Sequence, residues 1–479
     1  MSNNTNTYKN SLLGKIPTDW DVKELRDVCN KITDGTHDTP IPTNIGIPFL
    51  TAIHVKEEKI DFDGCYYVPL EIHKEIYRRC NPEKDDVLMV NIGAGVATTA
   101  LVNVDYEFSL KNVALLKPDD IKVIGQYLNY YQTFIKPKLT QSLLNGGAQP
   151  FLSLKQIQKL KILLPPLPEQ RAIATCLSTI DETITKTNQL ITQKELRKKW
   201  LMQQLLTGKK RLNLDSPDSG IKGLDDAEKS RQSINPENQG ADNGRKKLKG
   251  FGGEWKEALL KDCFKFIKSY SISREFLSRD KGDQYCIHYG DIHAFYETEF
   301  LDFDIQKLIP RLIDEKISIQ EKDYLKEGDV IMADASEDYQ GVGESIVVLN
   351  IENKIAVGGL HTVVLRDFAG STSANFRAYL FASEKVRNEL RKKATGTSVY
   401  SVTKITLESL LLVLPTIEEQ IAIAQVLQSS DKEIQLLKAK ADKLKEQKKG
   451  MMQVLLIGKK RLNLDSPDLG IEGLVIMND

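Results

Sequence analysis

The 479-residue chain has little that would place it in a membrane. Its longest apolar runs, such as those at 121–124 and 410–415, fall far short of the roughly 18–20 residues that a membrane-spanning helix needs. The amino-terminal stretch is polar and lacks the basic, apolar and small-residue order of a secretory signal. We therefore expect a cytoplasmic protein.

Metal-binding and disulfide patterns are also missing. The six cysteines are scattered, with no Cys-x-x-Cys pair and no short His/Cys spacing, so neither a disulfide framework nor a metal site is indicated. The chain has no excess charge, because 66 Lys and Arg equal 66 Asp and Glu. Any affinity for nucleic acid must therefore come from a local patch.

Signatures of catalysis are absent as well. The sequence GKKR at Gly208 lacks the upstream glycine and the following Ser or Thr of a phosphate-binding loop. LPPL at Leu164 lacks the polar first residue of an amino-methyltransferase tetrapeptide. PDSGIK at Pro217 has the form of a nuclease carboxylate pair, but the second copy of this stretch has Glu472 in place of Lys222. We predict no catalytic residue.

What the chain does contain is an internal repeat. GKKRLNLDSPD occurs at Gly208–Asp218 and again at Gly458–Asp468, 250 positions later. Upstream, the two sequences LKILLPPLPEQRAIATCL and LLLVLPTIEEQIAIAQVL align at the same offset, which pairs Glu169 with Glu419. A fixed offset over such a length indicates two copies of one structural unit.

Apolar residues in each copy alternate in steps of four and three, which is typical of a coiled-coil seam. The two predicted seams are Ile173, Leu177, Ile180, Ile184, Thr187, Ile191, Lys194, Lys198, Leu201 and Leu205, and Ile423, Leu427, Ser430, Ile434, Leu437, Ala441, Leu444, Lys448, Met451 and Leu455. The lysines are expected to mark more solvated stretches near the ends. The heptads leave open whether the helices run parallel or antiparallel.

Local signals place these helices at 166–207 and 416–457. A proline precedes each, acidic residues occupy the first turn, and glycine followed by Lys-Lys-Arg stands at the end. At 1.5 Å per residue, each helix is about 55–60 Å long. That length suits a spacer.

A mixed module precedes each helix, at 1–165 and 251–415. Short apolar runs at 86–90, 112–117, 328–332, 344–349 and 361–366 predict strands, and those at 124–135 and 375–394 predict helices. The segment 208–250 is too polar to fold alone, so it is expected to be a linker, and 458–479 a tail. The fold class is α+β.

Two variable modules on matched long helices suit the reading of two separated blocks of a DNA duplex. The order of the WxxxxL module, LPPLPEQRAIATCLSTID, long helix, QQLLTGKKRL, linker and second copy resembles the specificity subunit of type I restriction-modification systems over essentially the whole chain. The resemblance implies that the modules are target-recognition domains, each reading half of a bipartite site.

The same resemblance implies an antiparallel packing of the long helices as a ruler and two docked adenine methyltransferase subunits, with restriction and motor subunits joining that core. The repeated phrase would then mark two equivalent docking sites. S-adenosylmethionine, ATP and Mg are expected only on the partner subunits, and no cofactor on this chain.

Candidate DNA contacts are glycine-rich and polar loops, because glycine lets backbone approach phosphate and polar side chains pair with base edges. In the first module they are Asp34, Gly35, Thr36, His37, Asn91, Gly95, Asn145, Gly146, Gly147 and Gln149. In the second they are His288, Tyr289, Asp291, His293, Ser336, Glu337, Asp338, Thr395, Gly396, Thr397 and Ser398. Structural turns would have the same composition.

Two other functions stay open. The chain could be a complete enzyme with a fused methyltransferase, although it lacks the motifs and the length for that domain. It could also be a scaffold whose helices bind proteins and whose modules do not bind DNA.

Overall fold

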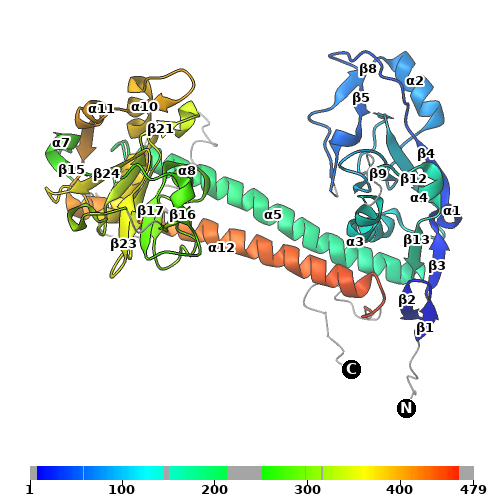
Figure 1. Cartoon of the computed structure of the whole chain (residues 1–479). Coiled ribbons are helices and arrows are strands. Elements are labelled where there is room, and N and C mark those ends of the chain that lie inside the picture. The colour runs from blue at the N-terminus through cyan, green and yellow to red at the C-terminus, as the bar shows by residue number, and fades with distance from the viewer. Residues whose placement is uncertain are drawn as a thin grey trace, which may run out of the picture. The chain divides into compact units, whose positions relative to one another are not determined.

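The computed structural model describes residues 8–57, 59–144, 150–212, 251–296, 298–313 and 317–462 (Figure 1). The chain divides into unit 1, residues 1–189 and 439–479, and unit 2, residues 190–438. Each unit thus combines one module with a part of both long helices. The predicted linker lies outside the described residues from position 213 onward, and the predicted tail from position 463.

Unit 1 contains a four-stranded antiparallel sheet in the order β10-β9-β12-β4 and a three-stranded sheet in the order β11-β5-β8. Its strands are β1 (Tyr8–Ser11), β2 (Gly14–Pro17), β3 (Asp21–Glu24), β4 (Cys29–Asp34), β5 (Ile47–Leu50), β6 (Val55–Lys56), β7 (Lys59–Ile60), β8 (Tyr66–Val68), β9 (Val87–Val90), β10 (Thr99–Leu101), β11 (Ser109–Leu110), β12 (Val113–Pro118) and β13 (Lys161–Leu164). The helices of its module are α1 (Leu25–Val28), α2 (Leu70–Arg79), α3 (Gly125–Leu144) and α4 (Leu154–Gln158).

Unit 2 repeats this plan with a five-stranded sheet, β15-β24-β20-β22-β18, and a four-stranded sheet, β16-β19-β17-β23. Its strands are β14 (Lys256–Leu259), β15 (Phe264–Ile267), β16 (Leu277–Ser278), β17 (Gln284–Ile287), β18 (Phe300–Asp302), β19 (Arg311–Leu312), β20 (Val330–Ala333), β21 (Ala335–Ser336), β22 (Ser345–Leu349), β23 (Ile355–Gly358), β24 (Thr362–Asp367), β25 (Tyr400–Ser401) and β26 (Leu411–Leu414). Its helices are α7 (Leu260–Cys263), α8 (Tyr289–Ala294), α9 (Ala374–Ala382), α10 (Glu384–Lys393) and α11 (Lys404–Glu408).

The five predicted strands are confirmed as β9, β12, β20, β22 and β24. All four residues of β9 and of β20 are buried, as expected for apolar runs at the centre of a sheet with both faces covered. The predicted helix 375–394 is wrong in one respect, because it is broken into α9 and α10. Ser383 leaves the helical conformation there (ψ 141°) and its Oγ accepts a hydrogen bond from the backbone N–H of Val386, which caps α10.

The long helices are α5 (Leu167–Leu205) and α12 (Ile417–Leu455), within two residues of the predicted bounds. Gly208 and Gly458 follow them, both with φ of 69°. This left-handed conformation lets the chain leave a helix and favours glycine. A Cβ at Gly458 would lie 2.5 Å from Cδ of Pro17, so the close approach requires glycine there as well.

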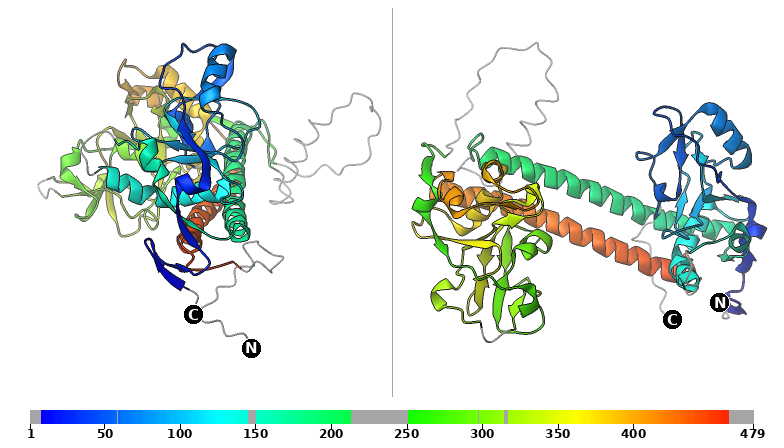
Figure 2. Two further views of the ribbon diagram at one scale, coloured as in Figure 1. Left: turned by 90° about the vertical axis from the view of Figure 1, so that its right-hand side faces the viewer. Right: turned by 45° about the horizontal axis from the view of Figure 1, so that its top comes forward.

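In each unit the segments of α5 and α12 run side by side in opposite directions (Figures 1 and 2). Along α5 in unit 2, Glu195 pairs with Lys438 and Lys198 with the earlier residue Asp431. In unit 1, Asp181 of α5 pairs with Lys448 of α12. The helix segments are therefore antiparallel in unit 2, as the family resemblance implies; a coiled-coil supercoil stays a prediction.

The predicted seam positions are all buried or partly buried along both helices. The expectation for the seam lysines is wrong, however. The side chains of Lys198 and Lys448 are only 15% and 10% exposed, and each ammonium group lies 2.6 Å from an aspartate of the other long helix. Because the ion pairs neutralise them, these lysines can stay in the seam.

Candidate nucleic-acid interface

The first predicted loop of unit 1 follows β4 and is anchored by its own polar side chains. The Asp34 carboxylate is buried and pairs with Arg79, and it lies 3.2 Å from Nε2 of His37. His37 is exposed, and its Nδ1 lies 2.8 Å from Oδ1 of Asn112. A Cβ on Gly35 would lie 2.0 Å from the carbonyl oxygen of Leu110. Gly35 is thus required for close backbone packing, while His37 faces outward.

The second loop of unit 1 follows β9 and meets the chain at 150–152. The carbonyl of Asn91 accepts a hydrogen bond from the backbone N–H of Leu152, and Ile92 forms an isolated bridge with Phe151. The Asn91 side chain is buried, whereas Gly95 is exposed. Residues Asn145, Gly146, Gly147 and Gln149 lie outside the described residues.

Unit 2 brings its three predicted stretches together, although the first of them is not a loop, because residues 289–294 form helix α8 with His288 as its N-cap. Strand β21, at 335–336, pairs with β25, at 400–401, which joins the loop at 334–341 to the loop at 394–401. The imidazole of His293 reaches the first of these loops, with Nε2 3.3 Å from the carbonyl oxygen of Ala335 and Nδ1 2.6 Å from the Glu344 carboxylate. All three stretches therefore share one surface region of unit 2.

Burial separates the candidates in unit 2 into two groups. The side chains of Ser336, His288 and Asp291 are buried. Nδ1 of His288 accepts from the N–H of Gly290, Oγ of Ser336 accepts from the N–H of Asp338, and Asp291 pairs with Arg274 and Arg279. Tyr289 and His293 are partly buried. The exposed candidates are Glu337, Asp338, Thr395, Gly396, Thr397 and Ser398.

The sequence interpretation missed His361. Its ring contacts Tyr289 edge-on at 5.3 Å, and its Nδ1 lies 3.4 Å from the Asp334 carboxylate. It has φ of 54° just before β24, as Asn112 has φ of 51° just before β12. The two positions are equivalent in the modules but differ in sequence, so similarity of residues could not reveal them.

Two histidines of this region have shifted pKa values of opposite sign. A hydrogen bond to Glu344 raises the pKa of His293 above its ordinary value of 6.5. Burial, with the nearby Arg274, lowers the pKa of His288. His293 therefore gains positive charge more readily than His288 as the pH falls.

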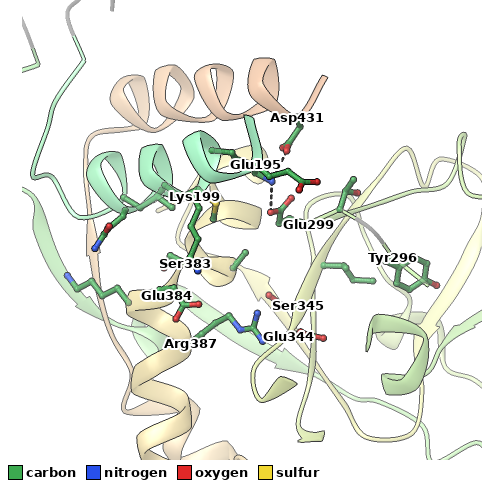
Figure 3. A pocket seen from close by; sticks show the side chains of 18 of the residues that line it. Glu195, Lys199, Tyr296, Glu299, Glu344, Ser345, Ser383, Glu384, Arg387 and Asp431 are labelled. Carbon is green, nitrogen blue, oxygen red and sulfur yellow. Dashed lines mark hydrogen bonds and ion pairs between the residues drawn. The ribbon is translucent and has the colours of Figure 1, made fainter. Parts of the chain in front are cut away.

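Each unit also has a cleft between its module and its long-helix segments. The cleft of unit 2 has a volume of about 740 Å³ and is lined by charged side chains that include Lys198, Glu299 and Asp431 (Figure 3). The cleft of unit 1, of about 650 Å³, is lined by Tyr130 and Asp181 among others. Burial lowers the pKa of Lys198, but Glu299 and Asp431 outweigh burial, so its pKa is raised and the lysine stays charged.

The junction between module and helix is built alike in both units. Oε1 of Gln170 accepts from the backbone N–H of Ile124, and its Nε2 donates to the carbonyl of Pro165. Oε1 of Gln420 accepts from the N–H of Ser373, and its Nε2 donates to the carbonyl of Pro415. The repeated glutamines thus fix each module to the helix that follows it.

Within the described ranges, no group of three or more His, Cys, Asp or Glu side chains could hold a metal ion. The described helices also include none that is long and apolar enough to cross a membrane.

Comparison with known proteins gives consistent matches along the chain. The family model "Type I restriction modification DNA specificity domain" matches residues 17–195 and 252–446. The MjaX specificity subunit of Methanocaldococcus jannaschii is 26% identical over 469 residues, 95% of this chain and 97% of that protein. The type I restriction enzyme MjaVIII specificity subunit of the same organism is 27% identical over 459 residues, 94% of each chain.

A solved chain from a study of "complex assembly and conformational transition of the type I R-M system" is similar in structure, with a TM-score of 0.55 and 15% identity. The match covers 93% of this chain and 99% of that chain. At this identity the likeness shows the fold.

Proposed function

Because the chain belongs to the family of type I restriction-modification DNA specificity proteins, we propose that each of its two modules reads one half of a bipartite DNA site. The family-level role is recognition of DNA sequence for a restriction-modification complex, as a subunit without catalysis of its own. What we propose beyond this role is the assignment of one half-site to each module.

The observation that carries this proposal is a shared framework with different loops. Both modules contain the same central strand order, β9-β12-β4 in unit 1 and β20-β24-β15 in unit 2. Both use an equivalent glutamine to join the following long helix. The loops at the strand ends differ in sequence, which suits two modules that read different bases with one scaffold.

Within those loops, the exposed side chains are the proposed DNA contacts. They are His37 in unit 1, and Glu337, Asp338, Thr397 and Ser398 in unit 2, with the backbone at Gly95, Thr395 and Gly396 available to phosphates. The buried candidates Asp34, Asn91, His288, Asp291 and Ser336 support the loops from inside. Thr36, Tyr289 and His293 are partly exposed, so their exposure is intermediate between that of the two groups.

The long helices are proposed to set the spacer between half-sites and to dock two adenine methyltransferase subunits, through which restriction and motor subunits join. Each helix has 39 residues, and the only proline and glycine in them are Pro168 in the first turn of α5 and Gly450 near the end of α12, which favours a stiff rod. S-adenosylmethionine, ATP and Mg would be bound by those partner subunits.

Gel-shift titration of the chain, with and without a methyltransferase subunit, tests DNA recognition. Binding should weaken steeply with salt, because phosphate contacts release counterions. The double variant T397A/S398A should weaken binding to the cognate site by roughly tenfold, the effect of losing one good base contact, while the exposed control E352Q should not. Absence of sequence-selective binding in every combination would favour a protein scaffold instead.

A further inference from the structure

A cluster of three polar side chains joins three elements of unit 1. The hydroxyl of Tyr130, on α3, donates to Oδ2 of Asp181, on α5, at 2.6 Å. Nζ of Lys448, on α12, lies 2.6 Å from the other oxygen of the same carboxylate, Oδ1. The ammonium group also lies 5.2 Å from the centre of the Tyr130 ring, within cation–π range. One aspartate therefore binds the module and the partner helix together.

Unit 2 contains the same cluster, built from other elements. The hydroxyl of Tyr379, on α9, donates to Oδ2 of Asp431, on α12, at 2.5 Å. Nζ of Lys198, on α5, lies 2.6 Å from Oδ1 of Asp431 and 5.4 Å from the centre of the Tyr379 ring. The two oxygens of the aspartate are divided between tyrosine and lysine in the same way in both units. We call these the Tyr–Asp–Lys clusters.

The clusters are mostly shielded from water, so a change in the distances between their charged groups is costly. The lysine and aspartate side chains are 10% and 29% exposed in unit 1, and 15% and 18% exposed in unit 2. A poorly hydrated charge is costly unless it is paired, so displacement of either helix or of the module along the seam is penalised. Apolar seam residues alone penalise such a shift less, because one apolar contact can replace another.

The tyrosine of each cluster lies on a helix that packs against the sheet whose strands lead into candidate DNA-contact loops. Helix α3 packs on β9, β10 and β12. The loop at 91–95 begins where β9 ends. Helix α9 likewise packs on β22, which pairs with β20, and the loop at 334–341 follows β20. In unit 1 the helix that carries the tyrosine thus packs directly on the strand that leads into a candidate loop, and in unit 2 one strand lies between them.

We propose that the two Tyr–Asp–Lys clusters position the modules for sequence recognition. Each cluster holds its module in a fixed orientation on the helix pair, and this orientation fixes the spacing between half-sites that the protein recognises. This inference rests on the proposed function. It assigns Tyr130, Asp181 and Lys448 to the first half-site and Tyr379, Asp431 and Lys198 to the second. None of the six is proposed to touch DNA.

In the unit 2 cluster, Lys198 also contacts a second carboxylate. Oε1 of Glu299, which stands just before β18, lies 2.7 Å from Nζ of Lys198, and Figure 3 shows Glu299 and Asp431 directed toward the same interaction partner. Removing the Lys198 charge would therefore leave two nearby carboxylates unneutralised.

The test uses the full chain in complex with methyltransferase subunits, once the wild-type site has been mapped. Methylation is measured on a DNA library in which both half-sites are kept and the spacer is varied by one or two base pairs. Y130F removes only the hydroxyl that ties module 1 to Asp181. Y127F is the control, because Tyr127 is also a buried tyrosine of α3, but its hydroxyl donates to the carbonyl of Leu163 within the module, at 2.9 Å.

Y130F should lower the preference for the correct spacer by about fivefold, the effect expected from one lost hydrogen bond, and Y127F should leave the preference unchanged. K448R should retain the preference, whereas K448M and K198M should each lose it. Y130F with wild-type spacer preference, or equal losses in Y130F and Y127F, would overturn the positioning role. A wild-type complex that ignored the spacer would instead overturn the proposed function.

Discussion

Arg461 binds Glu169 across 292 positions of sequence, with Nε 2.9 Å from Oε1 and Nη2 2.6 Å from Oε2. Glu169 is 2% exposed and stands in the first turn of α5, and it also accepts a hydrogen bond from the indole N–H of Trp20. In unit 2, Arg211 binds Glu419 in the same two-pronged manner. The arginine of the GKKR sequence that follows each long helix therefore binds the glutamate in the first turn of the other long helix.

This pairing gives the repeated GKKR phrase a role inside the chain, and it predicts the effect of Arg461→Met. The substitution leaves a buried carboxylate with one fewer cationic partner, so unit 1 should lose on the order of 3 kcal/mol of unfolding free energy. Urea denaturation of the full chain measures it. Lys459→Met is the control, because Lys459 is exposed in the same phrase; equal effects of the two variants would contradict a specific pairing.

The two helix-ending glycines have the same φ but different surroundings, so alanine should affect them unequally. Any alanine at φ of 69° costs about 1–2 kcal/mol. At Gly208 the nearest atoms to an added Cβ belong to Trp255, at 3.5 Å, which is ordinary contact. At Gly458 the Cβ would overlap Pro17 at 2.5 Å. G458A should therefore lower the melting temperature more than G208A, and the reverse order would contradict the described packing.

The sequence predicted the features that depend on periodicity. The seam follows from the spacing of apolar residues, the helix bounds follow from the proline, acidic and glycine signals at each end, and the central strands follow from short apolar runs. All of these signals lie within the segment itself. The seam lysines were misread because a lysine in a sequence gives no sign of its partner. Asp181 and Asp431 lie outside the predicted seam, and their pairing with the seam lysines is visible only in the structure, where the two helices lie side by side.

Tyrosines 130 and 379 show a different limit. Sliding the chain by 250 positions aligns the helices but misses this pair, whose offset is 249. The same one-residue difference separates Asn112 from His361. Within the candidate segments, polar composition could not separate buried residues such as Asp291 from exposed residues such as Thr397, because burial depends on the whole module.

The stability of unit 2 should depend on pH through His293. Its hydrogen bond to Glu344 raises its pKa above 6.5 in the folded state. A group with a raised folded pKa contributes stability that is fully present below the unfolded pKa and is lost as the pH rises through the folded pKa. The difference in unfolding free energy between wild type and H293Q should therefore shrink as the pH is raised from about 5.5 to about 8.5.

The pH dependence of stability that is expected from His288 has the opposite sign. Burial and Arg274 lower its pKa in the folded state, so its contribution is present above its unfolded pKa, near 6.5, and is lost as the pH falls through the lower folded pKa. The difference between wild type and H288Q should grow over the same pH rise. Parallel slopes for the two variants would contradict the assigned environments.

Lengthening both long helices tests the ruler. One added heptad extends a helix by about 10 Å, which corresponds to about three base pairs of duplex. Inserting the same seven residues into both α5 and α12, at equivalent positions, should lengthen the preferred spacer by about that amount. Methylation of the spacer library measures it, and an unchanged spacer would count against helices that set the distance.

The most direct measurement of the central claim is a map of methylated adenines after exchange of one module. Residues 20–160 are replaced by the corresponding module of another family member, and the chimera is produced with its methyltransferase partner. The account predicts that one half of the recognised site changes while the other half keeps its sequence. A map in which both halves change, or neither does, would contradict it.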